Sequence, residues 1–507
     1  MIILQETDDS LTHTVISRLT DKCRIHADTP QRDQTIKHRT ARHSPYRLVA
    51  FKDNIENRLA NTNNLTHILF RYGCKDTIFF GVPTKNQRIL SNFAHEMTKY
   101  NTFTLGNGLR IIHLPSNSQV VYCGYDIAAG TRNELSGEEG LAHFCEHMSF
   151  KGTARRNAIQ IINAIEGLGG ELNAFTNKED TVYYAAISRE HFSQAVDVLT
   201  DIVFHSQYPQ HEIDKEVEVI CDEIESYNDS PAELIYDEFE NLLFKGHPLG
   251  HNILGNAEQL RTYSTADALR FVSRNYLPEK MVFFVYGDID FKRLCKSLEH
   301  LMPDNSTLSE PSGEPALLAA EPARESQFIE HNRSTHQAHV MTGCLAYAYS
   351  DPRRITLYLL NNILGGPGMN ARLNLSLRER HGLVYTVEST MATYGDTGIW
   401  SIYFGCDHHD ISRCRRLVRH ELDRLMLKPL SQQLLTKAKR QLKGQLAIAC
   451  DNREQFALDF GRSYLHHGHE RNLDTLFRSI DAITAEELQT VACDLFDPEN
   501  MTTLIFR

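Results

Sequence analysis

The sequence predicts an α+β fold built from two similar halves, and three observations lead to this prediction. Apolar runs of strand character follow residue 97, and patterns with helical periodicity come after them. The same order of strands and then helices returns after a connector rich in Pro, Ser and Glu. We therefore expect an N-terminal extension at 1–96, a first half at 97–302, a linker at 303–326 and a second half at 327–507.

The expected elements of the first half follow one another along the chain. The stretch NTFTLGNGLRIIHL (101–114) predicts two strands joined by an Asn-Gly turn. A further strand is expected at VVYCGYDIAAG (120–130), where apolar residues dominate. Helices are expected at QIINAIEGLGG (160–170) and EHFSQAVDVLTDIVFH (190–205), where apolar residues recur at helical spacing.

The second half repeats the pattern of the first at a nearly constant distance. The stretch TADALRFVSRNYLPEKMVFFVYG (265–287) resembles TAEELQTVACDLFDPENMTTLIF (484–506), and their first residues lie 219 positions apart. Gly170 corresponds to Gly382 in the same way, at a distance of 212 positions. Similar offsets at two places are what a duplicated domain produces, so we expect two homologous halves.

Charge is distributed unevenly along the chain. Residues 1–96 contain 14 Lys and Arg and 10 Asp and Glu, whereas the remainder contains 39 and 55. The net charge of −12 argues against a nucleic-acid-binding protein, because such proteins usually present a basic face.

Residues 1–96 are polar and lack sustained periodicity, so we expect them to form a poorly ordered extension. We expect Met97 to be the natural start of the protein.

The cysteines and the lengths of the apolar runs bear on location. The 11 cysteines are scattered singly, without a Cys-x-x-Cys pair, which is typical of a reducing compartment. No run of 18 or more apolar residues occurs, so no membrane-spanning segment is expected. These observations favour a cytoplasmic protein of bacterial type over an organellar one.

The strongest chemical signal is the motif HFCEH within the stretch NELSGEEGLAHFCEHMSFKG. Ser136 and Glu139 have capping-box spacing and predict that a helix starts near them. On such a helix His143 and His147 lie one turn apart on one face, where both can bind one zinc ion. Glu146 can reach a water on that metal without being a ligand. Two solvated histidines on a surface helix are the alternative, since short motifs also arise by chance.

A zinc site needs a third protein ligand, and the helical stretch DKEVEVICDEIESYNDS (214–230) offers two candidates. Glu216 and Glu223 are seven residues apart and therefore lie two turns apart on one face. The apolar stripe expected to be buried comprises Val217, Ile220 and Ile224, and the acids expected to face solvent are Glu218, Asp222 and Glu225. Periodicity alone leaves both candidates open.

With these residues the chain resembles the M16 metallopeptidase family, which carries the inverted H-x-x-E-H motif and a distal glutamate. The short form with two halves is similar to the M16B group and to the subunits of the mitochondrial processing peptidase. The resemblance covers residues 97–507. It implies the metallohydrolase fold of the LuxS and processing-peptidase type, in which two homologous mixed α/β halves form a clamshell.

The resemblance implies a zinc-dependent metalloendopeptidase that hydrolyses unstructured or extended peptides through a metal-activated water, with one Zn²⁺ per chain. In this interpretation His143, His147 and Glu223 bind the zinc ion, and Glu146 is the general base. Glu216 matches a second acid of the family, which supports the catalytic site without being the first choice of ligand.

The resemblance also implies substrate-binding residues. The segment GGELNAFTNKEDTVYYA is similar to the edge-strand segment of the family, so Asn173 and Ala174 are expected to contact an extended substrate. The segment GGPGMNARLNLSLRERHGLVYTV is similar to one that carries an Arg/Tyr pair. Arg372 and Tyr385 match this pair and are expected to bind substrate carbonyls or to stabilise the transition state.

The two halves are expected to differ in chemistry. The second half has no H-x-x-E-H motif at the position that corresponds to the first, so it is expected to lack a metal site. The resemblance implies a homodimer, or a heterodimer with an M16-like partner. A non-catalytic structural or partner subunit of such a dimer is the alternative function. Subunits of that kind typically lose part of H-x-x-E-H, whereas this chain retains all of it.

Overall fold

The computed structural model describes residues 100–302, 326–469 and 472–507, which belong to one compact unit. The extension expected at 1–96 lies outside the described residues, as does all but the last residue of the expected linker. Within the described ranges, no helix is both long and apolar enough to cross a membrane.

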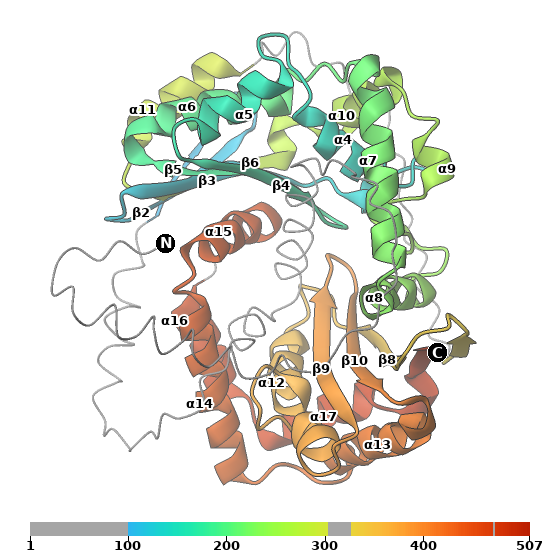
Figure 1. Ribbon diagram of the computed structural model, residues 1–507. Coiled ribbons are helices and arrows are strands. Elements are labelled where there is room, and N and C mark those ends of the chain that lie inside the picture. The colour runs from blue at the N-terminus through green and yellow to red at the C-terminus, as the bar shows by residue number, and fades with distance from the viewer. Residues whose placement is uncertain (1–99, 303–325, 470–471) are drawn as a thin grey trace, which may run out of the picture. The chain divides into compact units, whose positions relative to one another are not determined.

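The first half folds into a six-stranded sheet with helices packed on one face (Figure 1). Its strands are β1 (Asn101–Thr104), β2 (Arg110–Pro115), β3 (Val120–Ile127), β4 (Glu171–Thr176), β5 (Thr181–Ser188) and β6 (Met281–Gly287). Its helices are α4 (Leu141–Ser149), α5 (Ala158–Glu166), α6 (Phe192–Phe204), α7 (Gln210–Asn228), α8 (Pro231–Leu243), α9 (Ala257–Leu260), α10 (Thr265–Asn275) and α11 (Phe291–Leu301). The order of the strands is β1-β2-β6-β3-β5-β4, which leaves β4 at one edge.

The second half folds into a five-stranded sheet. Its strands are β7 (Phe328–His331), β8 (Ala338–Ala346), β9 (Val384–Thr393), β10 (Gly398–Cys406) and β11 (Thr502–Phe506). Its helices are α12 (Arg353–Gly365), α13 (Ile411–Leu427), α14 (Gln432–Ala449), α15 (Arg453–His467), α16 (Leu473–Ala482) and α17 (Ala485–Leu495), with a π-helical segment at Asn374–Glu379. The order of the strands is β7-β11-β8-β10-β9.

The five strands of the second sheet have the same topology as five strands of the first, and only β1 has no counterpart. In the first, β2 runs parallel to β6 and the order continues antiparallel through β3, β5 and β4. In the second, β7 runs parallel to β11 and the order continues antiparallel through β8, β10 and β9. The equivalent helices α10 and α17 also both begin on a capping box, at Ser264 and at Thr484. The prediction of two homologous halves is therefore confirmed.

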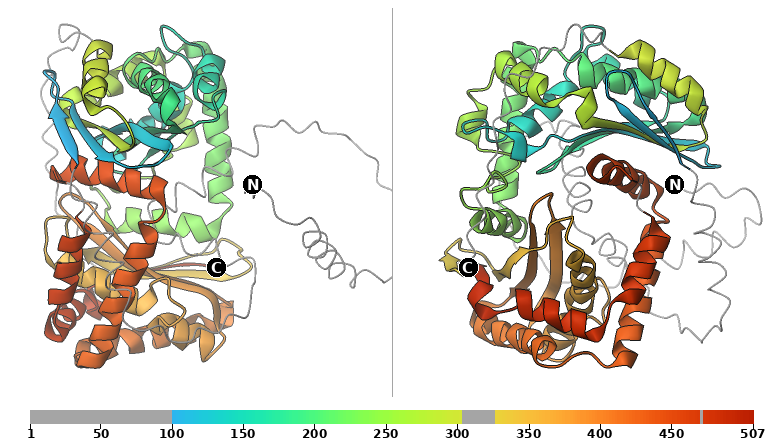
Figure 2. Two further views of the ribbon diagram at one scale, coloured as in Figure 1. Left: turned by 90° about the vertical axis from the view of Figure 1, so that its left-hand side faces the viewer. Right: turned by 180° about the vertical axis from the view of Figure 1, so that it is seen from behind.

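One helix of each half packs on the sheet of the other half. Helix α15 of the second half packs on the first sheet, and α8 of the first half packs on the second sheet (Figures 1 and 2). In the first buried cluster, α15 contributes Ala457, Leu458 and Phe460, and the first sheet contributes Ile112, Val182 and Phe284. In the second, α8 contributes Leu234, Ile235 and Phe239, and the second sheet contributes Met341, Tyr403 and Leu504. Separation of the halves would expose both apolar clusters to water, so their burial holds the halves together.

A buried pair of carboxyl groups lies where α15 meets the first sheet. Asp180 accepts hydrogen bonds from Nε of Arg462 at 2.6 Å and from Nε2 of His466 at 3.1 Å. Asp126 on β3 is fully buried, and neither of its carboxyl oxygens has a hydrogen-bond partner among the described residues. Burial and the charge of Asp180 raise the pKa of Asp126 above its ordinary value. The cationic groups that oppose this shift are His466, Arg462 and Arg110.

We expect an Asp126→Asn variant to gain stability relative to the wild type as the pH rises. The folded state holds a proton on Asp126 at pH values where the unfolded chain, with a pKa of about 3.9, has released it. The contribution of Asp126 to the free energy of unfolding therefore falls as the pH rises above that value, whereas the amide does not titrate. In urea unfolding, the gain should be larger at about pH 8.5 than at about pH 5 by at least about 1.4 kcal/mol, the equivalent of one pKa unit.

Asp229 provides a matched control, because its side chain is exposed at the end of α7. An Asp229→Asn variant should differ from the wild type by the same free energy at both pH values. If the free-energy difference between Asp126→Asn and the wild type were also the same at both pH values, Asp126 would not hold a proton in the folded state.

Candidate metal centre

Helix α4, which carries H-x-x-E-H, begins later than the sequence predicts. Ser136 and Glu139 do not cap it; the N-cap residue is Gly140, which has no side-chain hydrogen bond. Gly137 and Gly140 have φ angles of 87° and 91°, in the left-handed region that favours glycine. The prediction of a capping box is therefore wrong, because two glycine turns keep this segment out of the helix.

The N-terminus of α4 is instead capped by the side chain of Glu134. Its carboxyl group accepts hydrogen bonds from the backbone N–H of Gly140 at 3.0 Å and of Ala142 at 2.7 Å. Nε2 of His251 donates to the same group at 2.8 Å. These bonds satisfy N–H groups that a helix start leaves without partners. Glu134 lies six residues before the N-cap, a distance that matches no capping motif, so the sequence offers no signal for it.

Helix α7 presents two acids to α4 because its apolar stripe faces the core. Val217 and Ile220 are buried and Ile224 is half-buried against the core, as the sequence predicts. The acids predicted to face solvent are exposed, namely Glu218, Asp222 and Glu225. The other two, Glu216 and Glu223, both contact His147.

Three side chains from α4 and α7 converge at one point. Possible ligand atoms of His143, His147 and Glu223 all lie within 4.8 Å of one another. The imidazole ring centroids of the two histidines are 4.5 Å apart, as their spacing on one helix face requires. Nε2 of His147 lies 3.6 Å from Oε2 of Glu223. The fold thus brings together three predicted ligands, of which the last lies 76 residues beyond the motif.

Glu216 contacts the opposite nitrogen of the same imidazole. Nδ1 of His147 donates to Oε1 of Glu216 at 3.0 Å, and Nζ of Lys151 lies 2.5 Å from Oε2 of Glu216. A carboxylate that orients the outer nitrogen of a histidine is a common feature around zinc ligands. The geometry therefore favours Glu223 over Glu216 as the third ligand, a choice that periodicity alone leaves open and that agrees with what the resemblance implies.

The two histidines are held in different protonation states. Burial and the neighbouring imidazole of His147 lower the pKa of His143 to about 4, so its ring is neutral at pH 7. Burial opposes a charge on His147, but the hydrogen bond to Glu216 and the charge of Glu223 raise its pKa to about 9. Metal ions bind neutral imidazole, so binding here would release a proton from His147.

The residues that converge at this point fit a bound metal ion. Two imidazole nitrogens and one carboxylate oxygen form a ligand set found at catalytic zinc sites, which keep a further position open. Nδ1 of His143 is buried and has no hydrogen-bond partner among the described residues. A buried polar atom without a partner costs free energy, and a bound cation is one way in which such an atom is satisfied.

The second half differs at the equivalent place. Helices α12 and α14 correspond to α4 and α7, and neither contains His, Cys, Asp or Glu. A different group, formed by Asp407, His409 and Asp410, places possible ligand atoms within 4.8 Å of one another. It lies on the turn before α13, where Asp407 and His409 are exposed. This turn is not the counterpart of the motif helix.

Glu146, the predicted base, lies beside the converging ligands. Its side chain is buried, and its Oε2 accepts a hydrogen bond from Oγ1 of Thr176 at 2.6 Å. Thr176 is the last residue of the edge strand β4. Thr176 could not be identified from the sequence, because nothing in its local pattern shows which side chain of another element it contacts.

Asn173 and Ala174 lie on the edge strand β4, the place that the resemblance implies for them. The backbone N–H of Ala174 donates to Oδ1 of Asn173 at 2.8 Å. The amide Nδ2 of Asn173 is 3.4 Å from the hydroxyl of Tyr184. The backbone N–H of Ala174 is therefore already hydrogen-bonded to the side chain of its neighbour Asn173.

Arg372 and Tyr385 lie away from the converging ligands. Nη1 of Arg372 is 3.7 Å from Oε2 of Glu421 and is buried without a hydrogen-bond partner among the described residues. The side chain of Tyr385 is 72% exposed, and the guanidinium of Arg378 lies 5.4 Å from its ring centroid. Neither residue lines the cavity that contains His143.

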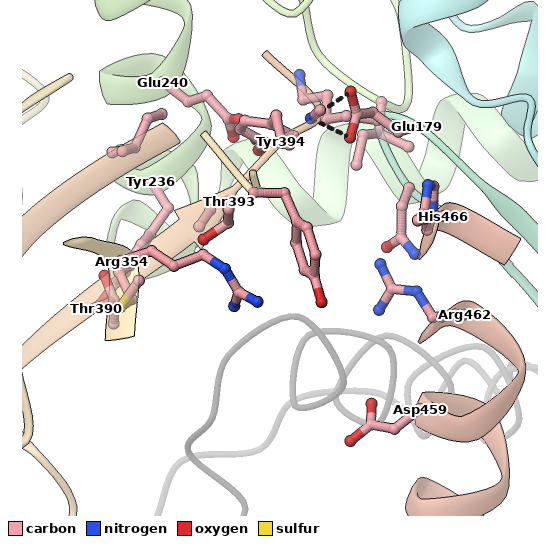
Figure 3. A pocket seen from close by; sticks show the side chains of 18 of the residues that line it. Glu179, Tyr236, Glu240, Arg354, Thr390, Thr393, Tyr394, Asp459, Arg462 and His466 are labelled. Carbon is pink, nitrogen blue, oxygen red and sulfur yellow. Dashed lines mark hydrogen bonds between the residues drawn. The ribbon is translucent and has the colours of Figure 1, made fainter. Parts of the chain in front are cut away.

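This cavity lies between the two halves and has a volume of about 1240 Å³. The first half contributes His143, Glu146 and Glu223 to its wall, and β9, α12 and α15 of the second half line it as well. Figure 3 shows Arg354 of α12 and Arg462 of α15 extending into it from different elements. The volume exceeds that of an ordinary small-molecule site, so a segment of extended chain fits better than a single metabolite.

Comparisons of the sequence cover both halves. Residues 111–257 match the family model described as insulinase (peptidase family M16), and residues 262–442 match the model described as the peptidase M16 inactive domain. An uncharacterized zinc protease of Bacillus subtilis is 31% identical over 405 residues, which are 80% of this chain and 97% of that protein. An uncharacterized zinc protease of Streptomyces coelicolor is 31% identical over 397 residues, covering 77% of this chain and 86% of that protein.

Solved structures share the fold. A protease from Helicobacter pylori superimposes with a TM-score of 0.75 at 21% identity, covering 81% of this chain and 100% of that one. A peptidase M16 inactive domain from Pseudomonas fluorescens superimposes with a TM-score of 0.70 at 20% identity, covering 80% and 97%. The predicted architecture of two mixed α/β halves is confirmed. The matches of both halves to the two family models and the identity to the bacterial relatives show that this chain belongs to peptidase family M16.

Proposed function

We propose that the protein is a zinc-dependent metalloendopeptidase that cleaves extended or unstructured peptides. The observation that carries this proposal is the convergence of His143, His147 and Glu223 next to a large cavity. His143, Glu223 and the neighbouring Glu146 line this cavity. Two relatives that match most of their own length to this chain are named zinc proteases, which supports zinc as the metal.

Each residue of the centre has a distinct task in this proposal. His143, His147 and Glu223 hold one zinc ion per chain, and Glu216 orients His147 through its Nδ1. When bound, zinc polarises a substrate carbonyl and makes water more acidic. Glu146 takes the proton of the attacking water on its carboxylate and later gives it to the leaving amine.

The substrate is proposed to add as a strand to the edge strand β4. Main-chain hydrogen bonds then supply affinity without regard to most side chains, which suits a peptidase that accepts varied extended segments. The N–H of Ala174 would exchange its bond to Asn173 for one to a substrate carbonyl, and the freed amide of Asn173 would bind the peptide in turn.

A partner chain is part of the proposal. Arg372 and Tyr385 do not line this cavity, so they would not contact a peptide bound at the metal centre of their own chain. They would contact a peptide bound at the metal centre of a partner chain, if their second half lies against that centre. We therefore propose that the protein works as a homodimer, or as a heterodimer with an M16-like chain. The exposed ring of Tyr385 is available for such a contact.

The test is cleavage of an unstructured peptide by the full chain before chelation, after chelation and after one equivalent of zinc is restored. We expect activity to fall to the background on chelation and to return with zinc. A folded protein of similar length serves as the control and should stay intact. Zinc bound at one per chain without cleavage of any peptide in a random library would contradict the proposal and would favour a non-catalytic subunit.

A further inference from the structure

The hydroxyl of Thr176 touches the candidate base at close range. Oγ1 of Thr176 donates to Oε2 of Glu146 at 2.6 Å, and both side chains are buried. This distance falls in the range of charge-assisted bonds from a hydroxyl to a carboxylate, which are among the stronger hydrogen bonds in proteins. A buried carboxylate held in this way has one oxygen committed to the protein.

The proton of this hydroxyl is directed at Glu146. A threonine hydroxyl has one proton to donate, and the neighbouring hydroxyl of Thr181 gives its own proton to the carbonyl of Ala129 at 2.8 Å. The two hydroxyls are 3.4 Å apart, so their mutual contact is long. Thr181 therefore lies beside Thr176 without being needed to hold the base.

The position of Thr176 is determined by the ladder of the first sheet. Thr176 pairs with Thr181 across β4 and β5, and its β-branched side chain has few rotamers. It is also the last residue of the strand on which we propose that a substrate strand adds. The element that would receive the peptide thus also carries the group that holds the base, so their relative positions are set by one rigid strand.

The turn that follows Thr176 is held by the second half. Asp180 accepts hydrogen bonds from Arg462 and His466 of α15. The backbone N–H of Gly395, beyond the end of β9, donates hydrogen bonds to Oε1 of Glu179 at 3.1 Å and to Oε2 at 3.0 Å (Figure 3). The second half therefore supports the end of the edge strand from two separate elements.

We propose that Thr176 is a positioning residue, whose hydroxyl holds the carboxylate of Glu146 in the orientation that it needs as a base. This inference rests on the proposed peptidase function. Thr176 acts through Glu146 and does not bind metal or substrate with its hydroxyl. Its removal should therefore slow turnover while leaving the binding of zinc and of peptide in place.

The test compares Thr176→Val, which removes the hydroxyl at nearly constant volume, with Thr176→Ser, which retains it. For the valine variant we expect kcat to fall by about 10- to 100-fold, the scale of loss when a catalytic group is misplaced by about 1 Å, with the zinc content unchanged. KM should stay within about twofold of the wild type, because uniform binding is not affected. The serine variant should recover most of kcat.

Thr181→Val is the matched control, because it removes the adjacent buried hydroxyl that does not touch Glu146. It should keep kcat. If the valine variant at Thr176 does not fold, Thr176→Ala replaces it in the same comparison with Thr176→Ser. A higher KM at constant kcat, a loss of zinc, or an unchanged kcat would each overturn the inference.

A Glu146→Gln variant separates this inference from the function on which it rests. Full activity of that variant would overturn the peptidase mechanism itself. An inactive Glu146→Gln variant beside a fully active Thr176→Val variant would overturn only the positioning role. In the Glu146→Gln background, adding Thr176→Val should cost nothing further, since the group that it positions no longer acts as a base.

Discussion

Replacement of Glu146 by glutamine is expected to lower kcat on an unstructured peptide by about 10²- to 10⁴-fold, the usual contribution of a general base. Glutamine has nearly the same size as glutamate, and its carbonyl can still accept the hydrogen bond from Thr176. Its amide cannot take a proton from water at neutral pH. Because Glu146 is not among the three converging ligands, zinc should stay bound at one per chain. Measurement of kcat and of zinc content on the same preparation checks both statements.

Glu166→Gln supplies the matched control for this variant. Glu166 is exposed at the end of α5 and does not line the cavity. The control should keep the kcat and the zinc content of the wild type. Activity of the Glu146→Gln variant close to that of the control would rule out Glu146 as the base.

Substitution of Glu223 by glutamine is expected to weaken zinc binding far more than the same change at Glu216. A neutral amide is a poor ligand for zinc, so loss of the carboxylate at Glu223 should lower the affinity by more than about 100-fold. At Glu216 the amide oxygen can still accept the Nδ1–H of His147, and the loss should remain at about 10- to 100-fold. Competition for zinc with a chelating dye measures both affinities.

Glu225→Gln is the control on the same helix, since Glu225 is exposed two residues beyond Glu223. It should bind zinc as the wild type does. A larger loss for Glu216→Gln than for Glu223→Gln would show that the first of these acids is the ligand. Equal and small losses for both would mean that the metal, if bound, is held elsewhere.

The course of the strands and helices could be predicted because their signals are local. The Asn-Gly turn between β1 and β2 forms where it is expected, and Gly108 has a φ angle of 93° that other residues avoid. The duplication could be predicted from two similar offsets, and the topology that the two sheets share over five strands confirms it. The cap of α4 could not be predicted, because Glu134 reaches it from outside every capping spacing.

The candidate metal centre likewise depends on one local contact, which could be predicted, and on contacts between elements, which could not. The spacing of His143 and His147 on one helix determines that their rings lie together, whatever the rest of the fold does. The choice between Glu216 and Glu223 depends on how far α7 is rotated and shifted against α4, which is a matter of packing between elements.

The sequence by itself thus determined two duplicated α+β halves, the motif helix and the residue types that could bind a metal. The resemblance already implied Glu223 as the third ligand, and the tertiary structure places it with the two histidines. Only the tertiary structure decided that Thr176 bonds to Glu146 and that Arg372 lies away from the cavity. The physical reason is the range of the interactions. Turns, caps and helical faces depend on neighbours within a few residues, whereas contacts between elements arise from the packing of two cores and their exchanged helices.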